Sequence, residues 1–88
     1  MKHATEPALD RVERLLDQLR QRGGLTERQR GVFYRGSRAF LHFHEDPTGL
    51  FVDVREAADW ERFPVTDAAD WPLLLRQVDV ALSRRPRP

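Results

Sequence analysis

The sequence contains no cysteine, which excludes disulfide bonds, thiolate zinc sites and a cysteine nucleophile. It also lacks any apolar run long enough to cross a membrane. Its first residues turn amphipathic at once, without the apolar core and small-residue cleavage site of a signal peptide. These three absences predict a cytoplasmic protein with no membrane partner.

Recognisable catalytic motifs are missing as well. No glycine-rich loop opens a helix after a strand, and neither Gly-x-Ser-x-Gly nor His-Glu-x-x-His occurs. We therefore assign no catalytic residue and no organic cofactor, and the sequence favours a binding protein over an enzyme.

At 88 residues the chain is long enough for one small domain. Thr5 and Pro7 are typical of a helix start, apolar residues then recur at helical spacing as far as Leu19, and Gly23 and Gly24 end the helix. Runs of alternating apolar residues bounded by turn residues predict strands in the middle of the chain. The predicted elements are helices over 6–22 and from Asp67 or Asp70 to Ser83, strands over 32–35, 38–45, 50–55 and 60–65, and a loop or a short turn of helix over 25–30.

Helices at both ends of an antiparallel meander predict an α+β fold in two layers, in the order α-β-β-β-(β)-α. Each helix has one apolar stripe, so both should pack on the same face of a three- to four-stranded sheet. We place the single domain at residues 6–83, with a flexible N-terminus over 1–5 and a disordered basic tail over 84–88.

The stretch AFLHFHEDPTGLFVDVR, residues 39–55, predicts a hairpin with a defined register. Asp46-Pro47-Thr48-Gly49 has the composition of a tight turn. A register shift of one residue would mix apolar and polar side chains on both faces, so the pattern favours one pairing. The predicted pairs are Glu45 with Leu50, His44 with Phe51, Phe43 with Val52, His42 with Asp53, and Leu41 with Val54.

This register places two kinds of side chain on the face away from the helices. Strict alternation assigns to that face Phe40, His42, His44, Phe51, Asp53 and Arg55. Aromatic side chains on an open sheet face favour pairing with a second copy, so we predict a homodimer with Phe40, Phe51 and Arg55 in its interface. Trp60 and Trp71 lie beside apolar positions, and we expect both in the core.

The two histidines on this face suggest a divalent-metal or small-ligand site. Imidazoles two residues apart on a strand point the same way, and a cross-strand carboxylate would complete a set of His42, His44 and Asp53. Glu61 or His3 could supply a fourth ligand. The alternative is that His42 only hydrogen-bonds Asp53 across the strands while His44 lies near Phe51.

Charge is unevenly distributed along a chain with a net charge of only +1. Residues 20–38 hold six arginines against one glutamate, whereas residues 39–70 hold eight acidic residues against two arginines. The basic stretch, with Phe33 and Tyr34 inside it, makes nucleic-acid binding an alternative function. The opposite charges of the two stretches also fit contact between two copies, or simply a mixed solvated surface.

The runs FLHFHEDPTGLFVDVR, WERFPV and LLLRQVDVAL resemble small bacterial proteins built on a domain of unknown function, some of which carry a luciferase-associated name. The resemblance covers roughly residues 31–83 and implies no activity, cofactor or catalytic residue. With the observations above, it leaves one leading hypothesis. This is a small interaction or ligand-binding domain that acts as a homodimer.

Overall fold

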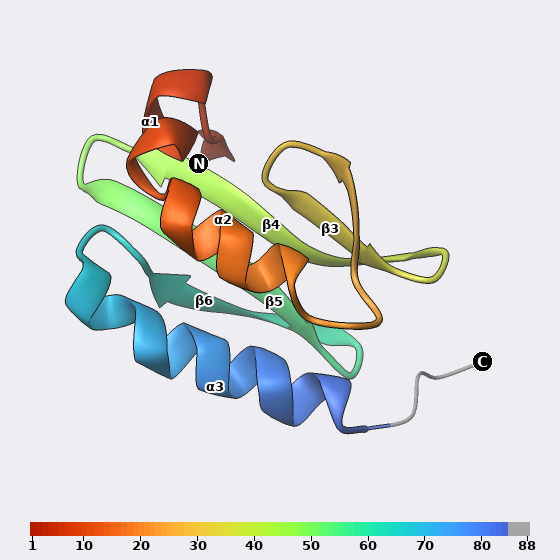
Figure 1. Cartoon of the computed structure of the whole chain (residues 1–88). Coiled ribbons are helices and arrows are strands. Elements are labelled where there is room, and N and C mark those ends of the chain that lie inside the picture. Colours follow the sequence, from red (N-terminus) through yellow and green to blue (C-terminus); the bar gives the residue numbers. More distant parts are fainter. Residues whose placement is uncertain (85–88) are drawn as a thin grey trace.

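The computed structural model describes residues 1–84 and confirms the predicted α+β fold (Figure 1). Residues 85–88, where most of the predicted disordered tail falls, lie outside the described residues. The elements are β1 (Lys2–His3), α1 (Glu6–Arg11), α2 (Glu13–Arg20), β2 (Thr26–Gln29), β3 (Val32–Arg35), β4 (Arg38–Asp46), β5 (Gly49–Glu56), β6 (Asp59–Pro64), a 3₁₀ turn at Ala68–Asp70 and α3 (Trp71–Leu82).

The strands form one antiparallel sheet in the order β2-β3-β4-β5-β6. The short strand β1 pairs with the C-terminal half of β4, and β3 pairs with the N-terminal half. The sheet therefore has six strands, where the sequence analysis predicted three or four. The two additional strands are β1 and β2.

Both additional strands lie where we expected irregular chain. The prediction of a flexible N-terminus over residues 1–5 misses β1, which is anchored on β4 because the Ala4 amide donates to the Phe43 carbonyl at 3.1 Å. The Thr5 hydroxyl then caps α1 by accepting from the Ala8 amide at 3.4 Å, as its sequence position suggested. Strand β2 replaces most of the predicted loop over 25–30.

The register of the central hairpin is the predicted one. The β4–β5 pairing includes His42 with Asp53 and His44 with Phe51, and every other pair expected from the apolar pattern. Asp46 closes the turn because its carboxylate accepts from the Thr48 amide at 2.8 Å. The hairpin thus fixes which side chains share a face.

Phe40 is the exception, and its predicted place on the outer face is wrong. Phe33 pairs with Leu41 and Tyr34 pairs with Ala39, so Phe40 is the extra residue of a β-bulge. The bulge interrupts the alternation of faces, and Phe40 lies in the hydrophobic core with only 4% of its surface exposed. A side chain so deeply buried is not available as an interface residue on the open face.

All helices pack on one face of the sheet, as predicted. In Figure 1, α2 crosses β4 and β5 on the same side of the sheet as α3, which runs along β6. The single helix expected over 6–22 is two helices, because the chain leaves helical geometry at Val12 (φ −116°, ψ 25°). The core between the layers includes Leu9, Val12, Leu15, Leu16 and Leu19 from α1, α2 and the residue between them, Phe33, Leu41, Phe43, Val52 and Val54 from the sheet, and Leu74 and Val78 from α3.

Within residues 1–84, none of the helices has the length and apolar character needed to cross a membrane. The layered arrangement leaves the second face of the sheet without a covering element in the part of the chain that the structure describes. We call this surface the open face.

Candidate ligand site on the open face

All three histidines of the chain meet on the open face. His42 and His44 project from the same side of β4, and β1 places His3 directly opposite His44. The ring centroids of His3 and His42 are 5.3 Å apart, and those of His42 and His44 are 4.6 Å apart. We call these three residues the histidine cluster.

Asp53 lies beside the cluster but is already engaged. Its two carboxylate oxygens accept from Nε and Nη2 of Arg62 at 2.8 and 2.9 Å, which is a bidentate pair. One of the same oxygens is 3.4 Å from Nε2 of His44. The side chain of Asp53 is 15% exposed, so this pair holds a carboxylate in place within a largely covered environment.

Two ring nitrogens of the cluster have no protein partner. Nδ1 of His3 and Nδ1 of His44 are both buried and accept or donate no hydrogen bond. A buried polar atom without a partner is costly and calls for an explanation, such as an ion or water that binds there. Since Nε2 of His44 faces the carboxylate of Asp53, the proton of a neutral ring belongs on Nε2, which leaves a free lone pair on Nδ1.

The cluster borders a shallow hollow. Its lining comes from His42, His44, Asp53 and Trp60, and its volume is about 140 Å³. Trp60, which we expected in the core, is 43% exposed, and its ring lies 4.6 Å from the guanidinium of Arg55 in a cation–π contact. Trp71 does pack against the core, and its indole donates to the Val65 carbonyl at 3.0 Å.

The local electrostatics favour one charge state each for His42 and Asp53 near neutral pH. Burial lowers the pKa of His42, and the neighbouring rings of His44 and His3 lower it further. The hydrogen bonds from Arg62 lower the pKa of Asp53. The site therefore presents a neutral imidazole at His42 next to an ionised carboxylate.

The predicted metal set is only partly assembled. Within the described part of the chain, no group of three or more histidine, aspartate or glutamate side chains could hold a metal ion in the positions that these side chains take in the structure. Glu61 pairs with Val54 and so belongs to the other face, whereas His3 does join the cluster. Metal binding by His42, His44 and Asp53 stays a prediction. Both carboxylate oxygens of Asp53 already accept hydrogen bonds from Arg62.

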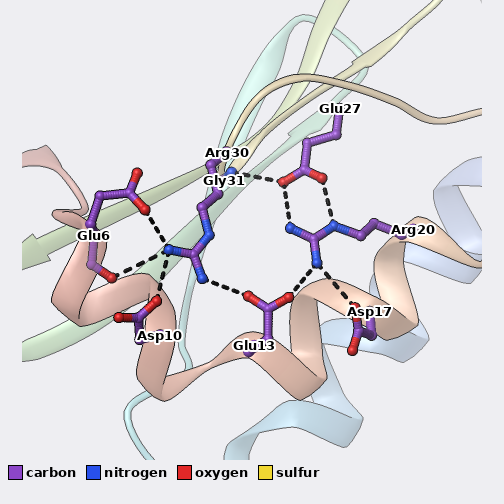
Figure 2. A network of polar contacts seen from close by, with 8 residues as sticks. All are labelled: Glu6, Asp10, Glu13, Asp17, Arg20, Glu27, Arg30 and Gly31. Carbon is purple, nitrogen blue, oxygen red and sulfur yellow. Dashed lines mark hydrogen bonds and ion pairs between the residues drawn. The ribbon is translucent and has the colours of Figure 1, made fainter.

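The basic stretch does not form a row of guanidinium groups on the open face. In Figure 2, Arg20 contacts Glu13, Asp17 and Glu27, while Arg30 contacts Glu6, Asp10 and Glu13. Two further arginines are bound on the helical side. Arg22 pairs with Asp79, and Arg35 donates to carbonyls at the end of α3. These contacts pair the positive charges on which the nucleic-acid alternative depends. Arg28, which lies over the Tyr34 ring, is the clearest remaining arginine for a contact with nucleic acid.

No protein-family model, no curated protein and no solved structure matches this chain. The site must therefore be interpreted from its own geometry. The sequence pattern identified His42, His44 and Asp53 through the hairpin register. It did not identify Arg62 or Trp60 as their neighbours, although the pairing of Asp53 with Arg62 follows once β6 is placed beside β5.

Proposed function

We propose that this chain is a small ligand-binding domain whose site is the hollow beside the histidine cluster. The observation that carries the proposal is the convergence of all three histidines, Asp53 and Trp60 on a sheet face that no described element covers. Binding sites characteristically combine a concave surface with a few polar groups that point to one place.

The size of the hollow limits the ligand. At about 140 Å³ it is smaller than the roughly 300–1,000 Å³ of pockets that enclose drug-sized molecules. An ion or a molecule of a few heavy atoms fits this space. The indole of Trp60 would cover one side of such a ligand, and the imidazoles and Asp53 would provide its polar contacts.

Nuclear magnetic resonance of the labelled protein tests this proposal with three separate probes, namely zinc chloride, sodium phosphate and sodium acetate. We expect at least one probe to shift the signals of His42, His44 and the Trp60 indole in a saturable way. The Trp71 indole, which packs against the core, is the internal control and should not move. If none of the three probes gives saturable shifts at the hollow, the proposed function is wrong.

Self-association through the open face is a second candidate. Phe51 is half-buried and Arg55 and Trp60 lie on the same face, so an apolar patch with charged neighbours remains uncovered in the single chain. A homodimer that used Phe51 and Arg55 would cover this patch and enclose the hollow between two copies. Phe40, which is buried, takes no part in this version of the interface.

A further inference from the structure

We propose that the histidine cluster is a zinc-class metal site in which His3, His42 and His44 are the ligands and Asp53 positions His44. This inference rests on the proposed function and names its ligand. It also changes the set predicted from sequence, because His3 replaces Asp53 as the third ligand.

The first argument is the placement of the three rings by the backbone. His42 and His44 share one side of β4, and His3 faces His44 from the adjoining strand. Side chains directly opposite each other on antiparallel strands have Cβ atoms about 4.5–5.5 Å apart. Once their rings turn, three imidazoles on adjoining strands could supply the His₃ set that leaves the fourth position of a tetrahedral zinc open.

The second argument is the state of the ring nitrogens. Nδ1 of His3 and Nδ1 of His44 are buried without a partner, and a metal ion would satisfy both nitrogens when each ring carries its proton on Nε2. The rings must turn about their side-chain bonds before three nitrogens reach one point at about 2.0–2.1 Å from zinc. This turning is the change that metal binding requires, because β1 and β4 already lie side by side.

The third argument is the role left for Asp53. Metal-binding histidines almost always give their second ring N–H to a carboxylate or carbonyl, which fixes the tautomer and orients the ring. The carboxylate of Asp53, 3.4 Å from Nε2 of His44 and held by Arg62, is placed for that role. Asp53 is therefore a positioning residue, and Arg62 holds it there.

The fourth argument is access. The hollow lined by His42, His44, Asp53 and Trp60 opens beside the cluster, so a ring turn that brings the ligand nitrogens towards it would leave the fourth coordination position open to water or a small anion. A zinc ion held by three neutral imidazoles keeps its double positive charge, which favours an anionic fourth ligand.

Calorimetric titration with zinc chloride is the first test. We expect the titration to give one zinc ion per chain. Thermal unfolding should show an increase of about 10 °C in the melting temperature at a zinc concentration about 100 times the dissociation constant. His3→Ala, His42→Ala and His44→Ala should each weaken binding more than Asp53→Asn, for which we expect a loss of about 10–100-fold. Glu61→Gln, on the other face, is the matched control and should bind zinc as the wild type does.

Cobalt(II) absorption separates ligands from the positioning residue. Asp53→Asn should keep the visible spectrum of a tetrahedral site at saturating cobalt, because all three imidazoles remain. His3→Gln, which preserves a polar side chain on β1, should change that spectrum. Wild-type zinc affinity in His3→Ala, or an unchanged cobalt spectrum in His3→Gln, would overturn the assignment.

The outcomes also separate this inference from the proposed function. If zinc has no effect while phosphate or acetate shifts the signals at the hollow, the metal site is wrong and the ligand-binding function stands. If zinc, phosphate and acetate all fail to bind at the hollow, both proposals are wrong.

Discussion

Phe40 departs from the alternation that the rest of its strand follows, whereas Phe51 keeps to it. Both belong to the face away from the helices if the strands alternate strictly, yet Phe40 is in the core and Phe51 is half-buried on the open face. The cause is the bulge opposite Phe33 and Tyr34, which adds one residue to β4. No feature of the sequence around Phe40 predicts the bulge, because the apolar run is continuous there.

Paired substitutions test this difference. Phe40→Ala should lower the free energy of unfolding by about 3–5 kcal/mol, since it removes a buried aromatic ring and leaves a cavity. Phe51→Ala should cost clearly less because its ring is only half-buried. Urea denaturation of both variants measures the two losses, and equal losses would mean that the bulge does not exist in solution.

Glu13 predicts a pH dependence of stability. Hydrogen bonds from Arg30 and Arg20 lower its pKa from the ordinary value of 4.5 (Figure 2). A carboxyl with a lowered pKa in the folded state stabilises that state above its unfolded pKa, and the contribution disappears as the pH falls through the folded pKa. Glu13→Gln should therefore cost about 1 kcal/mol at pH 7, as expected for partly exposed ion pairs.

The same variant provides its own control. Below the lowered pKa of Glu13 the wild type also carries a neutral side chain, so the stability difference between wild type and Glu13→Gln should shrink towards zero in acid. Urea denaturation across the range from pH 7 to pH 3 measures it. A difference that stays constant over this range would contradict the ion-pair explanation.

At the scale of elements, the long amphipathic segments were predictable and the short polar ones were not. The β4–β5 register follows from apolar alternation, because any slip would bury histidines and expose valines. Strand β2 consists of Thr-Glu-Arg-Gln and carries no apolar signal, and β1 has only two residues. Both form because β3 and β4 present unpaired backbone groups along their edges.

The position of His3 could not be predicted for the same reason. A two-residue strand has no recognisable sequence pattern, so His3 could be named only as an optional ligand. Two contacts place it in the structure. One is the backbone hydrogen bond from Ala4 to Phe43, which are 39 residues apart, and the other is the helix cap in which the Thr5 side chain accepts from Ala8, three residues on. The helix break at Val12 was not predictable from the sequence either, since the stripe of buried apolar residues continues through it.

Hydrogen exchange tests the hierarchy of elements. Amides of β4 and β5, which are paired on both sides for part of their length, should exchange most slowly, and those of β1 should exchange much faster. Exchange measured residue by residue at pH 7 provides the comparison. Fast exchange throughout β4 would contradict the sheet order, because β4 would then not be an interior strand.

At the scale of the whole molecule, the two-layer arrangement leaves one sheet face for function. This division was predictable because each helix has a single apolar stripe and can cover only one side. The contents of the open face were predictable where the register was, at His42, His44 and Asp53. Trp60 was not, because a tryptophan beside apolar positions resembles a core residue, and β6 turns it outward next to Arg55 instead.

The homodimer proposal belongs to this scale. Phe51→Ser should convert a dimer into a monomer in sedimentation equilibrium, since it removes apolar area from the proposed interface. Leu73→Ser is the matched control, because Leu73 is 61% exposed on α3 in the opposite layer and should leave the mass unchanged. A wild-type protein that is monomeric at high concentration, or a Phe51→Ser protein with the wild-type mass, would exclude this interface.

The most direct test of the account is to observe the three imidazoles in the metal-free protein. The central claim is that the fold brings every histidine of the chain to one place on the open face. Nuclear Overhauser measurements should give contacts between the rings of His3 and His42 and between those of His42 and His44, in line with centroid separations of 5.3 and 4.6 Å. If His3 gives no contact with either ring while the β4–β5 hairpin contacts are intact, the site does not assemble as described.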